Sequence, residues 1–559
     1  MNLSDTLLRL KYYLFPSWAL DGLWKCPPFR FKFFSTDAIY KDLDLGYDVL
    51  YGEVSLGEEV FYFKNFQSVE KNPYVPRIAL EYFHSFQWLQ HLNTINTQAA
   101  QERQFEILKS WLYVTNNGFK VSHRYAYKRH ILVRRLINWL TCIDFAAIKD
   151  EGLRNGLIQA TSFQVRLLLN LDYKTLGNDK DVNIAELIKG LEAKYICSYC
   201  IGLEKARDSI IDQLIQILNQ QVLRDGGIVG ESPSNILQIL GSLSLIFKSL
   251  EYEHEETKNH IRKCIDRLIT HILSLRYLDG KLATFGGGCE ETAKKISFIL
   301  ASFPLVADPL PRVRLSHAGY MGLKSPNINV TVKTPALAST PSLQRTEADV
   351  MASEVYIGLQ RIFVSSSLII DGKQKQITHS NAGFKYFGRN ISFSAVPKSN
   401  PSFRSNESWD ILLIECNNYM GRTGLRWSKQ IDLSKAGKGE EKACQAGLCM
   451  LCEDMITSSS DGEKLTGWFK FILHPTVCHR ATISKDNRTI YIKLGNTLWA
   501  FRFNQPFEIK KEHYCGYENA LHETMALYIF FNNQSSFKLE WQIAPQSWLE
   551  EISGEFNVA

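Results

Sequence analysis

The chain has 559 residues, which is too long for a single ordinary core, so we expect two or three domains, each with a sizeable interior. Hydrophobic residues make up 45% and charged residues 22% of the sequence, a composition that excludes a disordered chain and is typical of a soluble globular protein. The 64 basic and 58 acidic side chains give a net charge of +6 without long runs of Lys or Arg, so the sequence indicates no nucleic-acid partner.

Residues 1–75 are rich in aromatic side chains but show no sustained hydrophobic period, and we interpret them as a lead-in with short strand pieces such as EEVFYFKNF. The N-terminus lacks a continuous apolar region followed by a small-residue cleavage site. No stretch reaches the roughly 18 uncharged apolar residues that a membrane span needs. We therefore expect a cytoplasmic protein without an export signal and without a membrane span.

Residues 76–305 show the hydrophobic period of amphipathic helices. In RIALEYFHSFQWLQHLN, the pattern predicts one helix with Ile78, Tyr82, Phe86 and Leu89 on the same face. Further helices are predicted in HILVRRLINWLTCIDF, RDSIIDQLIQILNQQVL, SNILQILGSLSLIFKSL and NHIRKCIDRLITHILSL. Because short loops join them, we expect antiparallel helix pairs.

After the proline-rich segment FPLVADPLPRV, which we interpret as a linker, residues 312–559 change to a period of two. In RTIYIKLGNTLWAFRF, Gly495-Asn496 supplies a two-residue turn between alternating segments, which predicts a β-hairpin. Other strand-like segments are EVYIGLQRIFVSSS, DILLIEC, WFKFILHP, ALYIFFNN and FKLEWQIA. The pattern favours a large antiparallel β-sandwich.

Twelve cysteines are scattered along the chain and do not form the dense pattern of a disulfide scaffold, which indicates a reducing compartment. The two CxxC pairs, Cys197/Cys200 and Cys449/Cys452, lie in segments of different secondary structure. We interpret them as buried, unliganded thiols, with a zinc site as the alternative. We expect no metal and no cofactor.

Five motifs, in this order, resemble the heparinase II/III-like family of polysaccharide lyases: AYKRHILVRRLINWL, VLRDGGIVGESP, LDGKLATFGGG, LSHAGYMGL and FILHP. Each motif is short, but their common order extends the resemblance over about residues 50–545, as in a divergent member. The family fold that this implies is an N-terminal (α/α) toroid, here at 76–305, followed by a C-terminal antiparallel β-sandwich at 312–559. This agrees with the hydrophobic periods.

The resemblance implies cleavage of a uronate-containing glycan by β-elimination, which makes the protein a carbon–oxygen lyase acting on an acidic polysaccharide. This reaction needs a group that neutralises the uronate carboxylate, a base, and an acid for the departing oxygen. In the family, the site lies between toroid and sandwich, with an Asn, Tyr or His from the helices and a His from the strands. Family members are often exported, so periplasm or cell envelope is the alternative location. The oligomeric state cannot be read from the sequence.

The segment VRRLINWL matches the family at Arg134, Arg135 and Asn138. We interpret Asn138 as a catalytic candidate and both arginines as candidates for binding a glycan carboxylate. Helix packing, with the guanidinium groups solvated or paired internally, is the alternative. Tyr127, just upstream, is a candidate catalytic phenol, or a half-buried structural residue.

In RDGGIVGESPSN, Asp225 and Glu231 are candidate substrate contacts, and turn formation and helix capping are the alternative explanation. Relatives frequently carry a His after the Gly pair and an aromatic residue after the Pro. This sequence has Ile228 and Ser234 there, so two groups that handle protons are missing.

In QRTEADVMASE, the resemblance places Arg345 and Glu347 where relatives carry the two histidines of His-Ala-His-Ala, if Glu354 is set on the Glu of the following strand. A guanidinium cannot be deprotonated, and a carboxylate is normally already ionised. Glu347 remains a candidate base or metal ligand and Arg345 a candidate carboxylate clamp. The alternative is an ordinary surface ion pair.

His379, in THSNAGF, matches a family strand histidine and is the best remaining catalytic candidate. Trp427 stands where relatives commonly show a His before a basic pair, and His474 in LHP matches the family but is interpreted mainly as structural. Two functions therefore remain: a polysaccharide lyase, or a catalytically weakened glycan-binding protein that keeps the cleft. A single cleft shared by His379 and Asn138, Arg134 or a toroid Tyr would favour catalysis.

Overall fold

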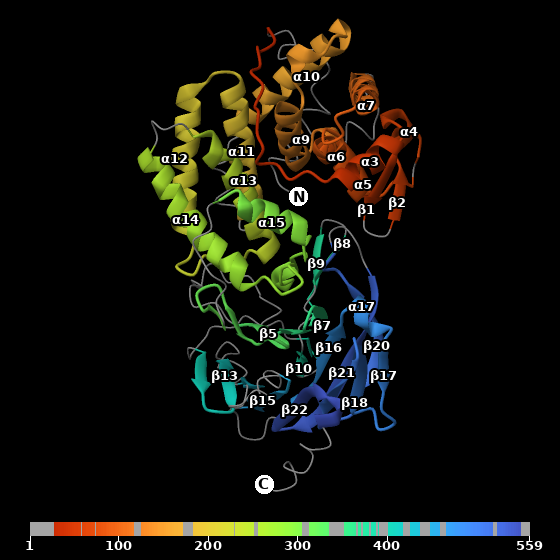
Figure 1. The fold of residues 1–559 in the computed structure, drawn as a ribbon, viewed down its shortest axis with the longest axis vertical. Coiled ribbons are helices and arrows are strands. Elements are labelled where there is room, and N and C mark those ends of the chain that lie inside the picture. Colours follow the sequence, from red (N-terminus) through yellow and green to blue (C-terminus); the bar gives the residue numbers. More distant parts are fainter. Residues whose placement is uncertain are drawn as a thin grey trace. The chain divides into compact units, whose positions relative to one another are not determined.

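The chain forms two compact units in the computed structural model (Figure 1). Unit 1 consists of Met1–Gln220, Gln238–Arg262 and Phe298–Phe303, and unit 2 consists of Gln221–Leu237, Lys263–Ser297 and Pro304–Ala559. The structure describes residues 27–56, 59–72, 74–116, 125–170, 183–228, 230–250, 255–303, 312–334, 351–364, 367–370, 373–378, 382–386, 389–390, 401–416, 425–435, 448–458, 465–517 and 522–548.

The boundary between the two units does not coincide with the change from helices to strands, because two helical segments belong to unit 2. The expected linker lies almost entirely outside the described residues, since 304–311 are not described. The domain boundaries 1–75, 76–305 and 312–559 stay a prediction.

Unit 1 is helical apart from one short hairpin. Side-chain caps mark several helix starts: Asp150 accepts a hydrogen bond from Leu153 N, and Asn183 accepts one from Ala185 N. Its elements are α3 (Leu43–Tyr51), β1 (Glu53–Leu56), β2 (Glu59–Tyr62), α4 (Phe66–Lys71), α5 (Arg77–Ser85), α6 (Gln87–Leu92), α7 (Gln98–Asn116), α9 (Arg129–Cys142), α10 (Glu151–Leu169), α11 (Ile184–Cys200) and α12 (Glu204–Gln221). The last residue of α12, Gln221, belongs to unit 2, and three further helices divide between the units, namely α13 (Pro233–Ser249), α14 (Glu255–Ser274) and α15 (Ala293–Ala301).

The single helix predicted over RIALEYFHSFQWLQHLN is wrong. The chain forms α5 and α6 there, separated by Phe86, whose φ of 57° lies in the left-handed region. Ile78 is 38% exposed, so the expected apolar face is not buried as one stripe. The Phe86 ring is fully buried, with its centroid 6.0 Å from that of Trp111 and 5.3 Å from that of Trp139. This aromatic packing offsets the backbone strain, which costs about 1–2 kcal/mol.

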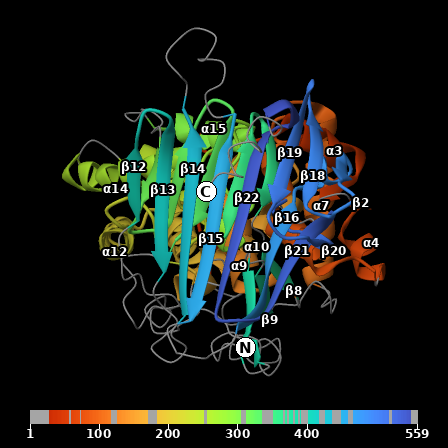
Figure 2. The ribbon, with the colours of Figure 1, turned by 90° about the horizontal axis from the view of Figure 1, so that it is seen from below.

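Unit 2 contains two large sheets, in which every described strand pair is antiparallel (Figure 2). One has the strand order β11-β10-β16-β7-β6-β5-β4-β3, with β21 beside β16 and β20 beside β21, and the other has the order β12-β13-β14-β15-β22-β19-β18-β17. Strands of the ten-stranded sheet are β3 (Arg312–Leu315), β4 (Tyr320–Lys324), β5 (Ile328–Lys333), β6 (Ser353–Ile357), β7 (Gln360–Val364), β10 (Ala382–Tyr386), β11 (Arg389–Asn390), β16 (Leu465–Leu473), β20 (Glu508–Tyr514) and β21 (His522–Gln534). Strands of the eight-stranded sheet are β12 (Ser402–Ser405), β13 (Trp409–Cys416), β14 (Leu425–Ser434), β15 (Met450–Ser458), β17 (Ala481–Ile483), β18 (Thr489–Leu494), β19 (Thr497–Phe503) and β22 (Ser536–Pro545).

The hairpin predicted around Gly495-Asn496 is confirmed. β18 and β19 pair antiparallel, with Leu494 opposite Thr497. Gly495 has a φ of 59°, as the first central position of a type II′ turn requires. The turn and the alternation are both local signals, so this element was predictable from the sequence.

The interior of unit 2 lies between the two sheets and is rich in aromatic rings. Phe363 and Phe471 come from the ten-stranded sheet, and Phe501 and Trp541 come from the eight-stranded one. Their ring centroids lie 5.4 Å apart for Phe363–Phe501 and 5.3 Å apart for Phe471–Trp541. Burial of these rings holds the two sheets together.

Asp454 is a fully buried carboxylate in this interior. It accepts hydrogen bonds from the indole nitrogens of Trp427, at 3.0 Å, and Trp541, at 3.1 Å. Its cationic partner is the buried Lys429, at 3.2 Å, which also donates to Ser353 Oγ on β6 of the other sheet. Trp427, where relatives commonly show a histidine, thus belongs to the core of the sandwich.

The cysteines of both CxxC pairs are buried free thiols. Burial raises the pKa of Cys200 and of Cys449 to about 12, so these thiols stay protonated at neutral pH. Within the ranges described above, no helix combines the length and the apolarity that crossing a bilayer requires.

Candidate functional site

Four of the five sequence motifs pack together within unit 2. In the RDGG turn, Leu223 N donates to Gly227 O at 2.8 Å. The Asp225 carboxylate accepts hydrogen bonds from Gly227 N, at 3.4 Å, and from Ala318 N, at 2.9 Å. Ala318 belongs to the motif LSHAGYMGL, so Asp225 joins two motifs that lie 93 residues apart.

Gly226 is the tightest point of this turn, and we expect Gly226→Ala to destabilise unit 2 by about 2–5 kcal/mol. Its φ is 78°, and a Cβ there would lie 1.8 Å from the Arg267 carbonyl oxygen. The matched control is Gly358→Ala, where φ is 56° but no atom lies within 4 Å of the added Cβ. Thermal unfolding of both variants measures the difference, and equal losses would contradict the close approach.

The motif LDGKLATFGGG packs against the end of VLRDGGIVGESP and the residue that follows it. An added Cβ on Gly288 would lie 3.0 Å from Ser232 Cβ, and Cys289 N donates to Ser234 Oγ at 3.1 Å. The backbone of Glu290 then bridges two segments, because its N–H donates to Gly516 O at 2.7 Å and its carbonyl accepts from Leu282 N at 2.8 Å.

Glu290 is the centre of a buried polar network. Its carboxylate accepts hydrogen bonds from His474 Nε2, at 2.8 Å, and from the Tyr514 hydroxyl, and it pairs with Lys281 Nζ at 2.6 Å. The Arg361 guanidinium lies 3.6 Å away. His474 comes from the fifth motif, FILHP, so the network joins the end of the helical region to strands β7, β16 and β20.

Electrostatics keep this carboxylate ionised. Burial by itself raises the pKa of Glu290, but Arg361, His474 and Lys281 outweigh it and hold the pKa well below its usual value. Burial lowers the pKa of His474, and Arg361 and Lys281 lower it further, against the opposing effect of Glu290. The network therefore consists of an ionised carboxylate beside an imidazole that is neutral at pH 7.

The tautomer of His474 follows from its second nitrogen. Nδ1 accepts a hydrogen bond from Thr476 N at 3.3 Å, so the imidazole proton lies on Nε2 and points to Glu290. This contact also caps the short helix α17 (Pro475–Cys478). The structural role expected for His474 is therefore present, but the same ring also holds the network together.

Tyr517 and Lys281 form the partly exposed edge of the network. The Tyr517 hydroxyl lies 3.3 Å from His474 Nε2, and Lys281 Nζ lies 5.6 Å from the centre of the Tyr517 ring. The ring of His522 packs on Tyr517 with a centroid distance of 4.5 Å. A phenol, an imidazole and a primary ammonium group are thus adjacent.

A second buried carboxylate, Glu354, supports this arrangement from β6. It accepts hydrogen bonds from the N–H and the hydroxyl of Thr284, at 2.8 and 2.6 Å. Burial raises the pKa of Glu354, while Arg361 opposes that shift. Arg361 also donates to Leu282 O at 2.8 Å and so fixes the loop that carries Lys281.

The candidates in the first motif lie in unit 1, where they make local contacts. Asn138 is buried and donates to Ser85 O at 2.9 Å. Arg135 is fully buried and donates to Gln164 Oε1 and to backbone carbonyls, and Arg134 pairs with Glu186 at 2.5 Å. Burial raises the pKa of Tyr127, and the positive charge of Arg135 opposes this shift. These are the contacts expected if the residues serve helix packing, with the guanidinium groups paired inside the protein. A role in catalysis or binding stays a prediction.

In unit 2, Asp225 forms the turn contacts described above, and Glu231 accepts a hydrogen bond from Asn235 Nδ2 at 2.7 Å. The Asp225 contacts are those of the turn alternative, whereas the cap of α13 comes from Ser232, whose Oγ accepts from Asn235 N at 3.3 Å. A role of Asp225 or Glu231 in substrate binding stays a prediction. His379, Glu347 and Arg345 lie outside the described residues. Whether His379 shares a cleft with Asn138, which would favour catalysis, therefore stays untested.

The sequence reasoning missed Glu290, Tyr514 and Tyr517. Glu290 stands two residues after FGGG, so its position close behind a matched motif was the only signal available. Across the part of the chain that the structure describes, no three His, Cys, Asp or Glu residues are placed to hold a metal ion together.

No protein-family model matches the chain, and no curated protein is significantly similar to it in sequence. Solved structures do match. A heparinase III structure aligns with a TM-score of 0.63 at 12% identity, covering 96% of this chain and 91% of that one. The heparinase III BT4657 gene product gives 0.53 at 12%, covering 97% and 90%. The heparan sulfate lyase HepC from Pedobacter heparinus gives 0.51 at 11%, covering 91% and 84%.

These likenesses define the class of fold as that of polysaccharide lyases built from an N-terminal (α/α) toroid and a C-terminal antiparallel β-sandwich. In particular, the chain has the fold of heparinase III. The fold class predicted from the sequence is confirmed, and so is the resemblance to the heparinase II/III-like lyases at the level of the fold.

Proposed function

We propose that the protein binds an acidic, uronate-containing polysaccharide and cleaves it by β-elimination, as a carbon–oxygen lyase. The heparinase III fold supports this proposal. The observation that carries it is the contact of 3.3 Å between the Tyr517 hydroxyl and His474 Nε2, beside Lys281.

Lys281 is the group proposed to receive the uronate carboxylate. Its side chain is 36% exposed, and its ammonium group is fixed by Glu290 Oε2 at 2.6 Å. Neutralising the carboxylate makes the adjacent C5 proton more acidic, which is the first requirement of the reaction.

Tyr517 is the group proposed to move the proton. In its phenolate form, Tyr517 takes the C5 proton and becomes the neutral phenol, while the C4–O bond breaks as the C4=C5 double bond forms. The phenol then gives this proton to the departing oxygen, which restores the phenolate. The His474 Nε2–H and the Lys281 ammonium both stabilise negative charge on the phenol oxygen during this step. Glu290 acts by position, since it orients His474 and Lys281.

The alternative is a glycan-binding protein with weak or no turnover. It is favoured by Arg345 and Glu347, which the resemblance places on two family histidines, so that one proton-transfer group would be missing. Release of unsaturated uronate, followed by ultraviolet absorbance over a panel of acidic glycans, separates the two functions. Binding without release would support the alternative.

His379 provides a test that comes from the sequence alone. If the missing histidine pair costs about 10²–10⁴ in rate, turnover is weak and depends on the proton-transfer groups that remain. We expect His379→Ala to abolish the residual release of unsaturated uronate while binding of the glycan persists. Vigorous turnover in this variant would remove His379 from the mechanism and leave Tyr517 as the base.

A further inference from the structure

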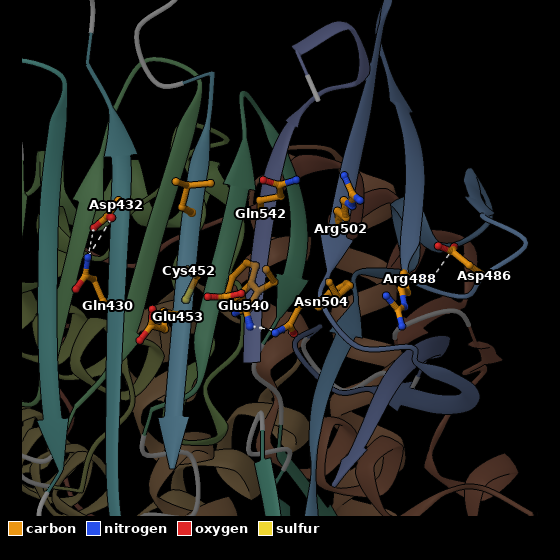
Figure 3. Close-up of a pocket in the computed structure, with 13 residues that line it drawn as sticks. Gln430, Asp432, Cys452, Glu453, Asp486, Arg488, Arg502, Asn504, Glu540 and Gln542 are labelled. Carbon is orange, nitrogen blue, oxygen red and sulfur yellow. Dashed lines mark hydrogen bonds between the residues drawn. The ribbon is translucent and has the colours of Figure 1, made fainter. Parts of the chain in front are cut away.

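A cavity lies on the outer face of the eight-stranded sheet, and its lining also includes Phe503 and Trp541 of the aromatic interior. Its volume is about 510 Å³, within the range of small-molecule sites. Figure 3 shows the polar side chains of β14, β15, β22 and β19 standing on this one face. None of its lining residues belongs to the Glu290 network.

The floor of the cavity contains two rows of side chains that cross these four strands. In the first row, Gln430 is opposite Glu453, and Glu453 is opposite Glu540. Asn504 completes the row, because its side-chain oxygen accepts a hydrogen bond from Glu540 N at 3.1 Å. Lys538 pairs with both glutamates, at 2.9 and 2.7 Å, and neutralises part of their charge.

The second row runs from Asp432 through Leu451 and Gln542 to Arg502. Asp432 accepts two hydrogen bonds from the Gln430 amide, at 3.0 and 3.1 Å. Among the residues that the structure describes, neither Asp432 nor Arg502 forms an ion pair within 4 Å. An unpaired carboxylate and an unpaired guanidinium thus mark the two ends of this row.

Aromatic side chains border the floor on one side. The next row of the sheet consists of small side chains, namely Cys449, Ala500 and Ala544. Trp409, Tyr491 and Trp548 pack over these small residues together with Leu451, and all three rings are half-buried. Leu451 also lines the cavity, so the aromatic border and the polar floor are continuous.

We propose that this cavity is a binding site for a neutral oligosaccharide. Carboxylates and amides in rows accept and donate hydrogen bonds to sugar hydroxyl groups, and half-buried aromatic rings at the border pack against the apolar faces of sugar rings. Simple alternation in a sheet explains polar residues on the outer face. It does not explain a cavity with unpaired charged groups beside an aromatic border.

Charge decides between neutral and acidic sugars. Four carboxylates line the cavity, from Asp432, Glu453, Asp486 and Glu540. The cations are the guanidinium groups of Arg488 and Arg502 in the lining and the Lys538 ammonium beside it, so the carboxylates are in excess by one. Burial raises the pKa of Asp432, and the hydrogen bonds from Gln430 lower it in part. The negative charge of Glu453 raises this pKa further. A uronate polymer would be repelled there, whereas a neutral sugar would not.

The test uses the full chain and saturation-transfer NMR with hexasaccharides of glucose, mannose and N-acetylglucosamine, and with hexagalacturonate as the acidic probe. We expect at least one neutral hexasaccharide to bind. Asp432→Ala should weaken that binding roughly tenfold or more, because a hydrogen bond to a charged group is lost. Trp548→Ala tests the aromatic border in the same way, and circular dichroism checks that both variants are folded.

The matched control is Glu508→Ala, which removes an exposed carboxylate from β20 of the other sheet. We expect it to bind the neutral sugar like the unchanged protein. Absence of binding by every neutral probe overturns the site, as does binding that Asp432→Ala leaves intact. Hexagalacturonate binding that is lost in Asp432→Ala would overturn the neutral specificity. Uronate turnover is measured separately, so failure here leaves the proposed lyase function standing.

Discussion

Replacing Tyr517 by phenylalanine is expected to lower the turnover number on uronate polymers by about 10²–10⁴-fold, because the variant lacks the hydroxyl group proposed to move the proton. The ring of Tyr517 packs against His474 and His522, and phenylalanine keeps those contacts. The loss should therefore fall on kcat while KM for the polymer changes little. The measurement is the initial rate of ultraviolet absorbance from unsaturated uronate.

Tyr74→Phe is the matched control for this prediction, since it removes a hydroxyl group from a side chain that is 88% exposed in unit 1. It should retain full activity. If Tyr517→Phe keeps the kcat of the unchanged protein, the phenol is not the base. A rise in KM at constant kcat would instead make Tyr517 a binding residue, as in the glycan-binding alternative.

Replacing Asp454 by alanine is expected to destabilise unit 2 by about 3–5 kcal/mol, because it leaves the Lys429 ammonium buried without its anionic partner. The indole N–H groups of Trp427 and Trp541 also lose their acceptor. For a unit of this size, the melting temperature should fall by roughly 10 °C or more. Differential scanning calorimetry measures the change.

A second variant separates the ion pair from simple loss of packing. Replacing both partners by apolar residues, as in Lys429→Met with Asp454→Leu, removes the uncompensated charge and should recover much of the loss. The exposed pair of Glu508 and Lys510, at 3.4 Å, provides the surface comparison. Glu508→Ala should change the unfolding free energy by about 0.5 kcal/mol or less. A double variant as unstable as Asp454→Ala would contradict the charge argument.

Elements with local signals could be predicted from the sequence, and elements set by distant partners could not. The hairpin at Gly495 depends on alternation and turn chemistry within sixteen residues, and it was predicted correctly. The break at Phe86 has no local signal, because neither Gly nor Pro stands there. Packing of its ring against Trp111 and Trp139 determines the break, and those residues lie 25 or more positions away in the sequence.

The same limit applies to the site. The motifs were visible in the sequence, but a motif does not reveal which of its side chains meets which partner. His474 and Glu290 are 184 residues apart, and Tyr514 is 224 residues from Glu290. The family resemblance predicts catalytic histidines on strands, whereas the described network is centred on a carboxylate that comes just before α15.

The interleaving of the two units affects how the protein can be divided. A fragment that begins at Arg312 would contain every strand of both large sheets but would lack Lys281 and Glu290. His474, Tyr514 and Arg361 would then lose the anion that they enclose. A cut at the proline-rich segment therefore separates Lys281 and Glu290 from the rest of the charge network. If residues 312–559 were exchanged between related genes, the Glu290 network would be preserved only if residues 263–297 were exchanged with them.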